Sequence, residues 1–139
     1  MSSEFIQDLT RTLKVHEGLE LKPYRCTADK LTIGVGRNLE DVGITEAEAD
    51  FLLSNDIQRV VAALDDRTPW WNTLPIGKRV VLASMAFQLG IGGLMQFRKF
   101  LAAAEKGDNE EAITQMKDSR WYRQTPRRVD QLIKRWLEQ

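Results

Sequence analysis

The chain of 139 residues contains a single cysteine, so no disulfide can form within it. Disulfides persist in oxidising compartments, and their absence is typical of proteins that fold in a reducing cytosol. The N-terminal residues lack the apolar run of a secretory signal peptide, and the longest apolar stretch, near residues 80–87, is too short to span a bilayer. We therefore expect a soluble protein without membrane insertion.

The sequence also lacks net charge, because 20 basic residues balance 20 acidic ones. No overall field is therefore available to attract nucleic acid. The charge is unevenly distributed, however: between Lys117 and Trp136 seven basic residues accompany only two acidic ones, Asp118 and Asp130. This excess indicates either a solvated helix face or an anionic partner. A nucleic-acid binder that uses residues 117–136 remains a rival hypothesis, although no recognised DNA-binding motif supports it.

The first third of the sequence predicts one helix followed by a small sheet. Apolar residues at helical spacing predict a helix over about residues 3–16, with Ser3 as its N-cap and Gly18 as its stop. Residues 19–42 contain proline and several glycines, which break helices, and Leu31-Thr32-Ile33 favours a strand. We expect short antiparallel strands in this segment.

The remaining sequence predicts helices. Thr45 and Glu48 form a capping box that opens a helix of about 20 residues, about 30 Å long. Later helices are expected to begin near Pro75, Leu94, Asp108 and Thr125-Pro126, and the tryptophans at 70, 71, 121 and 136 are expected to pack in the core. The predicted fold is a single α+β domain. Residues 17–60 form a small lobe, residues 1–16 with 65–139 form a helical lobe, and the long helix joins them.

Three polar side chains are spaced so that a hairpin would bring them together: Glu17 at the end of the first helix, Cys26 and Thr32. Hydrolysis of a glycosidic bond needs one carboxylic acid to protonate the leaving oxygen and a second group that activates water or attacks directly. Glu17 would supply the acid and Thr32 would hold the water. A solvated surface glutamate is the plain alternative, and spacing alone does not decide between them.

Two segments, EGLELKPY (17–24) and LTIGVG (31–36), resemble the catalytic segment of the phage-type lysozymes, the T-even endolysin family of muramidases. The family signature is a Glu, eight residues, an Asp, five residues and a Thr followed by Ile-Gly-x-Gly. Glu17 and Thr32 occupy its first and last positions. SMAFQLG (84–90) and SRWYRQTPRRV (119–129) also resemble the family's cleft helix and C-terminal lobe. The resemblance implies a lysozyme-like fold.

The resemblance further implies hydrolysis of the β-1,4 bond between N-acetylmuramic acid and N-acetylglucosamine in bacterial peptidoglycan, with neither a metal nor an organic cofactor. It implies a monomeric endolysin that accumulates in the host cytoplasm. Such an enzyme reaches the cell wall when a separate holin opens the inner membrane, and it causes host cell lysis. The alternative is a non-catalytic peptidoglycan-binding relative that is disabled at position 26.

Position 26 departs from the family, because Cys26 replaces the usual aspartate. In the first interpretation Cys26 does the work of the aspartate as a thiolate or weak acceptor. In the second it is a nucleophile, and the enzyme retains the anomeric configuration. In the third it fills space, and Asp29 supplies the carboxylate or activity is lost. A carboxylate at Glu17 would disfavour the thiolate, whereas cations at Lys22 or Arg25 would favour it.

Other positions are assigned by the same resemblance. Arg128 aligns with an arginine that orients the catalytic acid. Arg37 replaces a family histidine whose partner aligns with Asp56, and we predict a structural Arg37–Asp56 ion pair. A core role is the alternative for Phe87. Five positions align with residues that contact the substrate in the family: Phe87, Gln88, Asn38, Phe100 and Gln115. Phe87 and Gln88 also match the family in residue type, whereas the other three differ from it.

Overall fold

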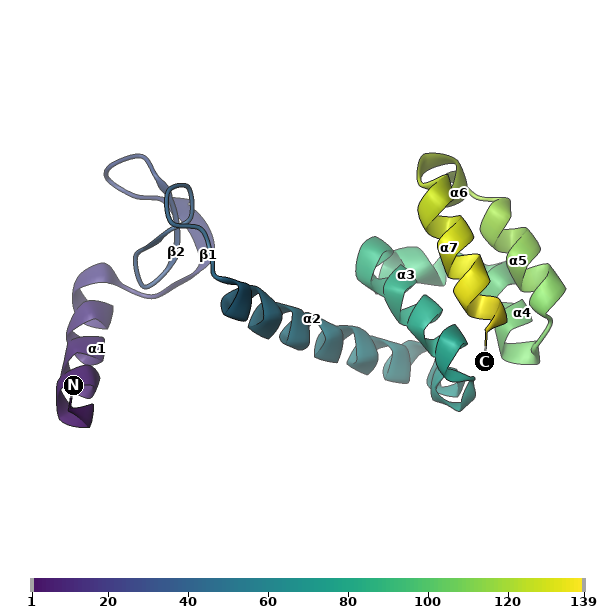
Figure 1. The fold of residues 1–139 in the computed structure, drawn as a ribbon, viewed down its shortest axis with the longest axis horizontal. Helices are drawn as coiled ribbons and strands as arrows, with labels where there is room; N and C mark the ends of the chain where they lie inside the picture. Colours follow the sequence, from purple (N-terminus) through teal and green to yellow (C-terminus); the bar gives the residue numbers. More distant parts are fainter. Residues whose placement is uncertain (1, 139) are drawn as a thin grey trace. The chain divides into compact units, whose positions relative to one another are not determined.

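A computed structural model describes residues 2–138 and divides the chain into two compact units, one up to Phe51 and one from Leu52. The boundary falls inside the long helix α2 (Glu46–Arg67), which confirms the predicted helix of about this length. The fold is α+β, as predicted: a three-stranded antiparallel sheet lies in the first unit, and the described part of the second unit is built of helices (Figure 1).

The first unit begins with α1 (Ser3–Glu17), whose N-cap lies one residue earlier than predicted. The side chain of Ser2, rather than that of Ser3, accepts a hydrogen bond from the Phe5 N–H at 3.2 Å. The helix ends at Gly18, whose φ of 78° is accessible to glycine without strain, so the predicted stop is confirmed. The structure groups α1 with the sheet. Its predicted packing on the helical lobe concerns the placement of the two units and stays a prediction.

The sheet contains β1 (Glu20–Arg25), β2 (Leu31–Gly34) and β3 (Arg37–Asn38) in that order, with antiparallel pairing throughout. Pro23 is tolerated within β1 because the register is irregular between Glu20 and Tyr24. Thr32 lies on the central strand, opposite Tyr24 on one side and Asn38 on the other. The sheet therefore buries Thr32, leaving it 3% exposed.

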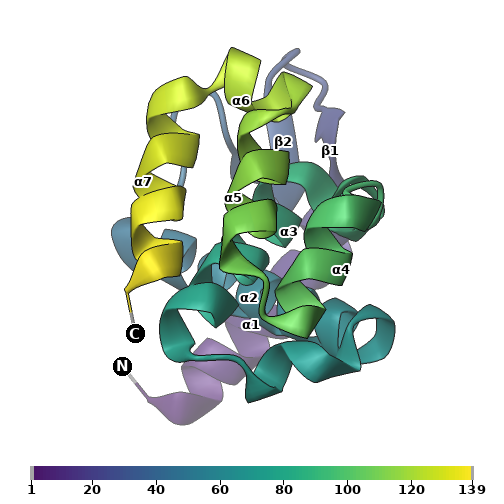
Figure 2. The ribbon, with the colours of Figure 1, turned by 90° about the vertical axis from the view of Figure 1, so that its right-hand side faces the viewer.

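The second unit packs its helices around one apolar core. Figure 2 shows α5 beside α7 on one side and α4 on the other, in agreement with their contacts. Burying one large apolar side chain contributes roughly 1.5–3 kcal/mol. The elements are η1 (Pro69–Thr73), α3 (Ile76–Met95), α4 (Arg98–Lys106), α5 (Asn109–Lys117), α6 (Arg120–Gln124) and α7 (Pro126–Leu137). Side chains buried in this core include Leu64, Trp71, Leu82, Met85, Leu94, Phe100, Met116, Trp121, Val129 and Trp136.

Two boundaries differ from the predictions. Pro75 precedes the first residue of α3 instead of occupying it. Gly90 introduces a local break in α3, with φ 75° and ψ 159°, after which the helix continues to Met95. The following helix therefore begins at Arg98 instead of Leu94. Leu94 is fully buried, so packing of the continued segment against the core overrides the helix-breaking tendency of the glycines.

Several local signals are confirmed. Asp108 caps α5 by accepting a hydrogen bond from the Glu111 N–H at 3.1 Å, and Pro126 is the first residue of α7. The short elements η1 and α6 were not predicted. α7 ends at Leu137, and position 139 of the predicted domain lies outside the described residues. No single helix in the described range is long and apolar enough to cross a bilayer; only the pair α3 and α4, bent by 108°, has the combined length and composition.

Candidate active site

The three signature residues all belong to the first unit. Glu17 is the last residue of α1, Cys26 directly follows β1, and Thr32 is the second residue of β2. Because Tyr24 pairs with Thr32 and Arg25 with Leu31, the hairpin places Cys26 and Thr32 at the same end of the β1–β2 ladder. The hairpin therefore brings two of the three predicted groups to one end of the ladder, whereas the convergence of both with Glu17 stays a prediction.

A tight turn holds Cys26 in place. Its N–H donates to the Lys30 carbonyl at 3.0 Å, and its carbonyl accepts from the Asp29 N–H at 2.8 Å. Asp29 has a φ of 59°, a left-handed conformation that aspartate tolerates better than most residues. The Arg25 guanidinium donates to the Asp29 carbonyl at 3.4 Å. These contacts explain why an aspartate stands at position 29 without assigning its carboxylate a chemical role.

The surroundings of the half-buried Cys26 thiol favour its ionised form. The backbone N–H groups of Lys30 and then Ala28, followed by the Thr32 hydroxyl, lower the pKa of the thiol through hydrogen bonds, and this effect exceeds the opposing effect of desolvation. The predicted cation Arg25 is not among these causes. It pairs with Glu40 at 2.6 Å, largely exposed to solvent. A lowered pKa is the property that a reactive or basic cysteine requires.

The hydroxyl of Thr32 donates to the Lys30 carbonyl at 2.8 Å. The same hydroxyl is also one of the groups that lower the pKa of the Cys26 thiol. A hydroxyl carries one donor and two acceptor lone pairs. A water held by Thr32 would therefore donate to the threonine oxygen, which leaves a lone pair of that water free to attack.

Arg37 has a partner within its own unit. Its guanidinium contacts the Glu48 carboxylate at 2.8 Å, and the Thr45 N–H donates to the same carboxylate at 2.8 Å. These contacts, the Arg37 hydrogen bond first, lower the pKa of Glu48 to about 2. Asp56 forms an ion pair with Arg59, one turn along α2. The predicted Arg37–Asp56 pair would join the two units and stays a prediction, with each side chain already engaged elsewhere.

Asn38 is also engaged locally. Its amide oxygen accepts from the Asp41 N–H at 3.0 Å, and its amide nitrogen donates to the Asp41 carboxylate at 3.0 Å. This closed pair stabilises the chain after β3. A saccharide contact through Asn38 stays a prediction, and it would have to compete with both bonds.

In the second unit, Gln88 on α3 binds the indole of Trp121. The indole N–H donates to the Gln88 side-chain oxygen at 3.0 Å, and Trp121 itself is 5% exposed. The amide nitrogen of Gln88 is not used in this bond and remains as a donor. Phe87 is 50% exposed and lines a small apolar groove between α2 and α3, so the structure does not bury it in the core. Arg128 is exposed on α7.

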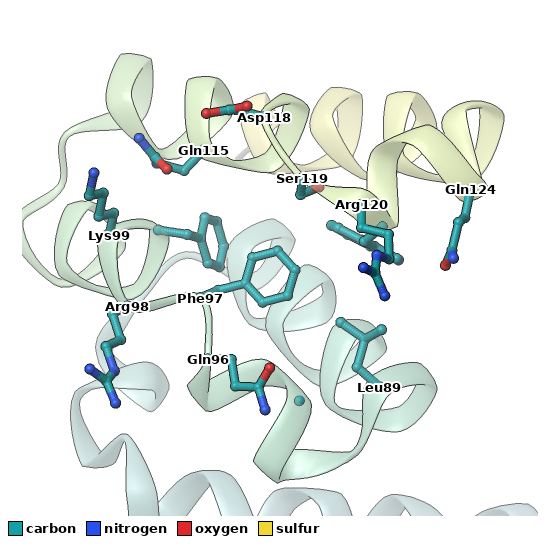
Figure 3. A pocket seen from close by; sticks show the side chains of 13 residues that line it. Leu89, Gln96, Phe97, Arg98, Lys99, Gln115, Asp118, Ser119, Arg120 and Gln124 are labelled. Atoms are coloured by element: carbon teal, nitrogen blue, oxygen red, sulfur yellow. The ribbon is translucent and has the colours of Figure 1, made fainter.

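A pocket of about 750 Å³ lies among α3, α4, α5 and α6 (Figure 3). Figure 3 shows the ring of Phe97 pointing into it, with Gln115 above and Arg120 on the far side. Phe100 also lines the pocket, but it is only 1% exposed, so it can serve as part of the floor rather than as a protruding contact. Gln115 donates to Glu111 at 2.7 Å. This volume is typical of a small-ligand site.

Sequence reasoning missed two features of these sites. The charged rim of the pocket, formed by Arg98, Lys99 and Arg120, comes from two segments, the starts of α4 and α6, that meet only in the folded protein. Glu48 was identified as a cap, but its second role as the partner of Arg37 was not. The capping box supplied a usable signal for it, because its position next to β3 follows from the short connection between β3 and α2.

Comparison with known proteins identifies the family. The phage lysozyme family model matches residues 14–138, and the chain therefore belongs to the phage lysozyme family. Over 152 aligned residues it is 30% identical to the pre-baseplate central spike protein Gp5 of Enterobacteria phage T4, covering 89% of this chain and 26% of that protein. It is 25% identical to the probable T4-type lysozyme 2 of Dictyostelium discoideum, covering 92% of both chains.

A third similarity is shorter. Over 57 residues the chain is 42% identical to an endolysin of Acyrthosiphon pisum secondary endosymbiont phage 1, covering 38% of each protein. The chain thus spans about a quarter of the T4 spike protein and nearly all of the Dictyostelium lysozyme. Besides belonging to the phage lysozyme family, the chain is therefore similar to proteins named lysozyme and endolysin.

Proposed function

We propose that this protein is an endolysin that hydrolyses the β-1,4 bond between N-acetylmuramic acid and N-acetylglucosamine in peptidoglycan. The observation that supports it most directly is that the hairpin brings Cys26 and Thr32 to the same end of the β1–β2 ladder, at the positions where the family signature has an aspartate and a threonine. Membership of the phage lysozyme family and similarity to proteins named lysozyme and endolysin support the reaction class.

In the proposed mechanism Glu17 is the general acid and protonates the glycosidic oxygen of the leaving sugar. A water that donates to the Thr32 oxygen transfers its other proton to the Cys26 thiolate as it attacks the anomeric carbon from the opposite face. The proton lost by Glu17 leaves with the departing hydroxyl, and the thiolate becomes a thiol. This sequence inverts the anomeric carbon. The hydrogen bonds that lower the pKa of Cys26 favour this role over that of an apolar filler.

Replacing Glu17 by glutamine tests the acid. The amide keeps the shape of the side chain but cannot donate the proton, so release of reducing ends from cell walls should fall by at least about a hundredfold. Glu20→Gln, which removes an exposed carboxylate three residues further on, is the matched control and should keep activity. Circular dichroism checks that both variants fold. Full lysis by Glu17→Gln would end the enzyme proposal in this form.

Two replacements of Cys26 test its proposed role as the base that accepts a proton from water. Cys26→Ser removes an ionisable side chain, and most turnover should be lost, whereas Cys26→Asp restores a carboxylate base and should keep it. Equal activity of Cys26→Ser and the parent would mean that the thiol has no chemical role. Nuclear magnetic resonance of the first product distinguishes the remaining interpretations, because a retained β-anomer would indicate a nucleophilic cysteine.

The same assays separate the alternative of a peptidoglycan-binding relative, which would bind cell walls without releasing reducing ends. The proposed biological setting is a monomer in the host cytoplasm that needs a holin to reach the wall. Expression with and without a pore-forming protein tests this setting, because lysis should occur only when both are present.

A further inference from the structure

The turn between β2 and β3 approaches the side chain of Glu17. Gly36, in this turn, has no side chain, and a Cβ placed on it would lie 3.0 Å from the Glu17 Oε2 atom and 3.4 Å from its Cβ and Cδ atoms. A Cβ in a folded protein rarely has a neighbour as close as 3.0 Å. The Glu17 side chain therefore occupies the space that any residue larger than glycine would need at position 36.

A second requirement for glycine is present at the same position. Gly36 has a φ of 68°, a left-handed conformation that residues with a Cβ adopt at a cost. Gly34, two residues earlier in the same hairpin, has nearly the same conformation, with a φ of 72°. A Cβ placed on Gly34, however, would meet no atom within 4 Å. The two glycines therefore share the backbone requirement, and only Gly36 contacts Glu17.

We propose that Gly36 is a positioning residue for the catalytic acid: because Gly36 has no side chain, the Glu17 carboxyl group can lie against its Cα. This inference rests on the proposed function of Glu17. The atom that a new Cβ would meet first is the end of a flexible side chain rather than backbone. The structure would therefore respond by moving the carboxyl group and leaving the turn in place. Displacement of a catalytic group by about 1 Å can lower the rate roughly a hundredfold.

The pair Gly36→Ala and Gly34→Ala tests this inference. Because each variant places a Cβ at a positive φ, both melting temperatures should fall. The kcat of Gly36→Ala on peptidoglycan should fall by at least about tenfold with KM unchanged, since the acid moves and the rest of the site does not. Gly34→Ala should keep kcat within about threefold of the parent. A merely structural role for Gly36 would lower activity only in proportion to the folded fraction.

A second pair, Gly36→Asn and Gly34→Asn, covers the case in which the alanine variants do not fold, because asparagine tolerates a positive φ. Equal kcat for the two members of either folded pair would overturn the positioning role. Glu17→Gln, measured in parallel, keeps the two proposals apart. If it is fully active, the proposed function fails; if it is inactive while Gly36 and Gly34 variants behave alike, only the inference about Gly36 fails.

Discussion

Replacing Gln88 by leucine separates the structural role of this side chain from its predicted role in substrate contact. Leucine is similar in size but cannot accept the hydrogen bond from the Trp121 indole, which is 3.0 Å long and largely shielded from water. Leaving a buried N–H without a partner costs about 1–3 kcal/mol. Trp121 also packs edge-to-face against Phe97, with ring centroids 5.9 Å apart, so it is not free to turn toward solvent.

The matched variant is Gln88→Glu, which keeps an acceptor oxygen for the indole but replaces the amide donor by a second oxygen. We expect Gln88→Leu to lower the urea midpoint by an amount that corresponds to about 1–2 kcal/mol, with an unchanged m-value. Gln88→Glu should keep most of that stability. If the amide nitrogen contacts substrate, Gln88→Glu should instead raise KM for cell-wall fragments.

Urea titration followed by tryptophan fluorescence measures the first effect, and steady-state kinetics measures the second. Two results would refute the reasoning about stability: an unchanged midpoint for Gln88→Leu, or an equal loss for Gln88→Leu and Gln88→Glu. The second result would mean that size, rather than the acceptor, matters at this position. An unchanged KM for a stable Gln88→Glu would remove Gln88 from the predicted substrate contacts.

Two further predictions concern the stability of the scaffold. Because the pKa of Glu48 falls from its ordinary value of 4.5 to about 2 on folding, its contribution is fully present above pH 4.5 and is lost as the pH falls toward 2; acid titration of Glu48→Gln should show a shallower loss of stability in this window. In α3, a Cβ on Gly77 would lie 2.6 Å from the Arg135 carbonyl, so Gly77→Ala should cost about 1–3 kcal/mol in a urea titration. Gly92→Ala, which meets no neighbour, should instead be neutral or stabilising by up to about 1 kcal/mol.

Local signals in the sequence predicted local structure well. Gly18 ends α1, Asp108 caps α5, and Thr45 with Glu48 forms the reciprocal capping bonds of α2. Each of these depends on residues within four positions of one another, so the sequence alone contains the necessary information. The two hairpin partners Cys26 and Thr32 are only six residues apart, and their convergence was predictable for the same reason.

Features that depend on distant contacts were not predictable. The helix α3 continues past Gly90 because Leu94 is buried in a core that residues from other helices complete. The bond between Gln88 and Trp121 joins side chains 33 positions apart. The contact of Arg37 with Glu48 is a different case: the capping box and the short connection between β3 and α2 offered a signal for it, but the family pattern assigned Arg37 another partner.

The single thiol of the chain also makes the protein easy to label. All four tryptophans, at positions 70, 71, 121 and 136, belong to the second unit, whereas Cys26 lies in the first. A maleimide dye attached at position 26 would be the sole energy acceptor for indole donors on the other side of the boundary in α2. Transfer efficiency in solution would then report the separation of the two units directly, without engineered labelling sites.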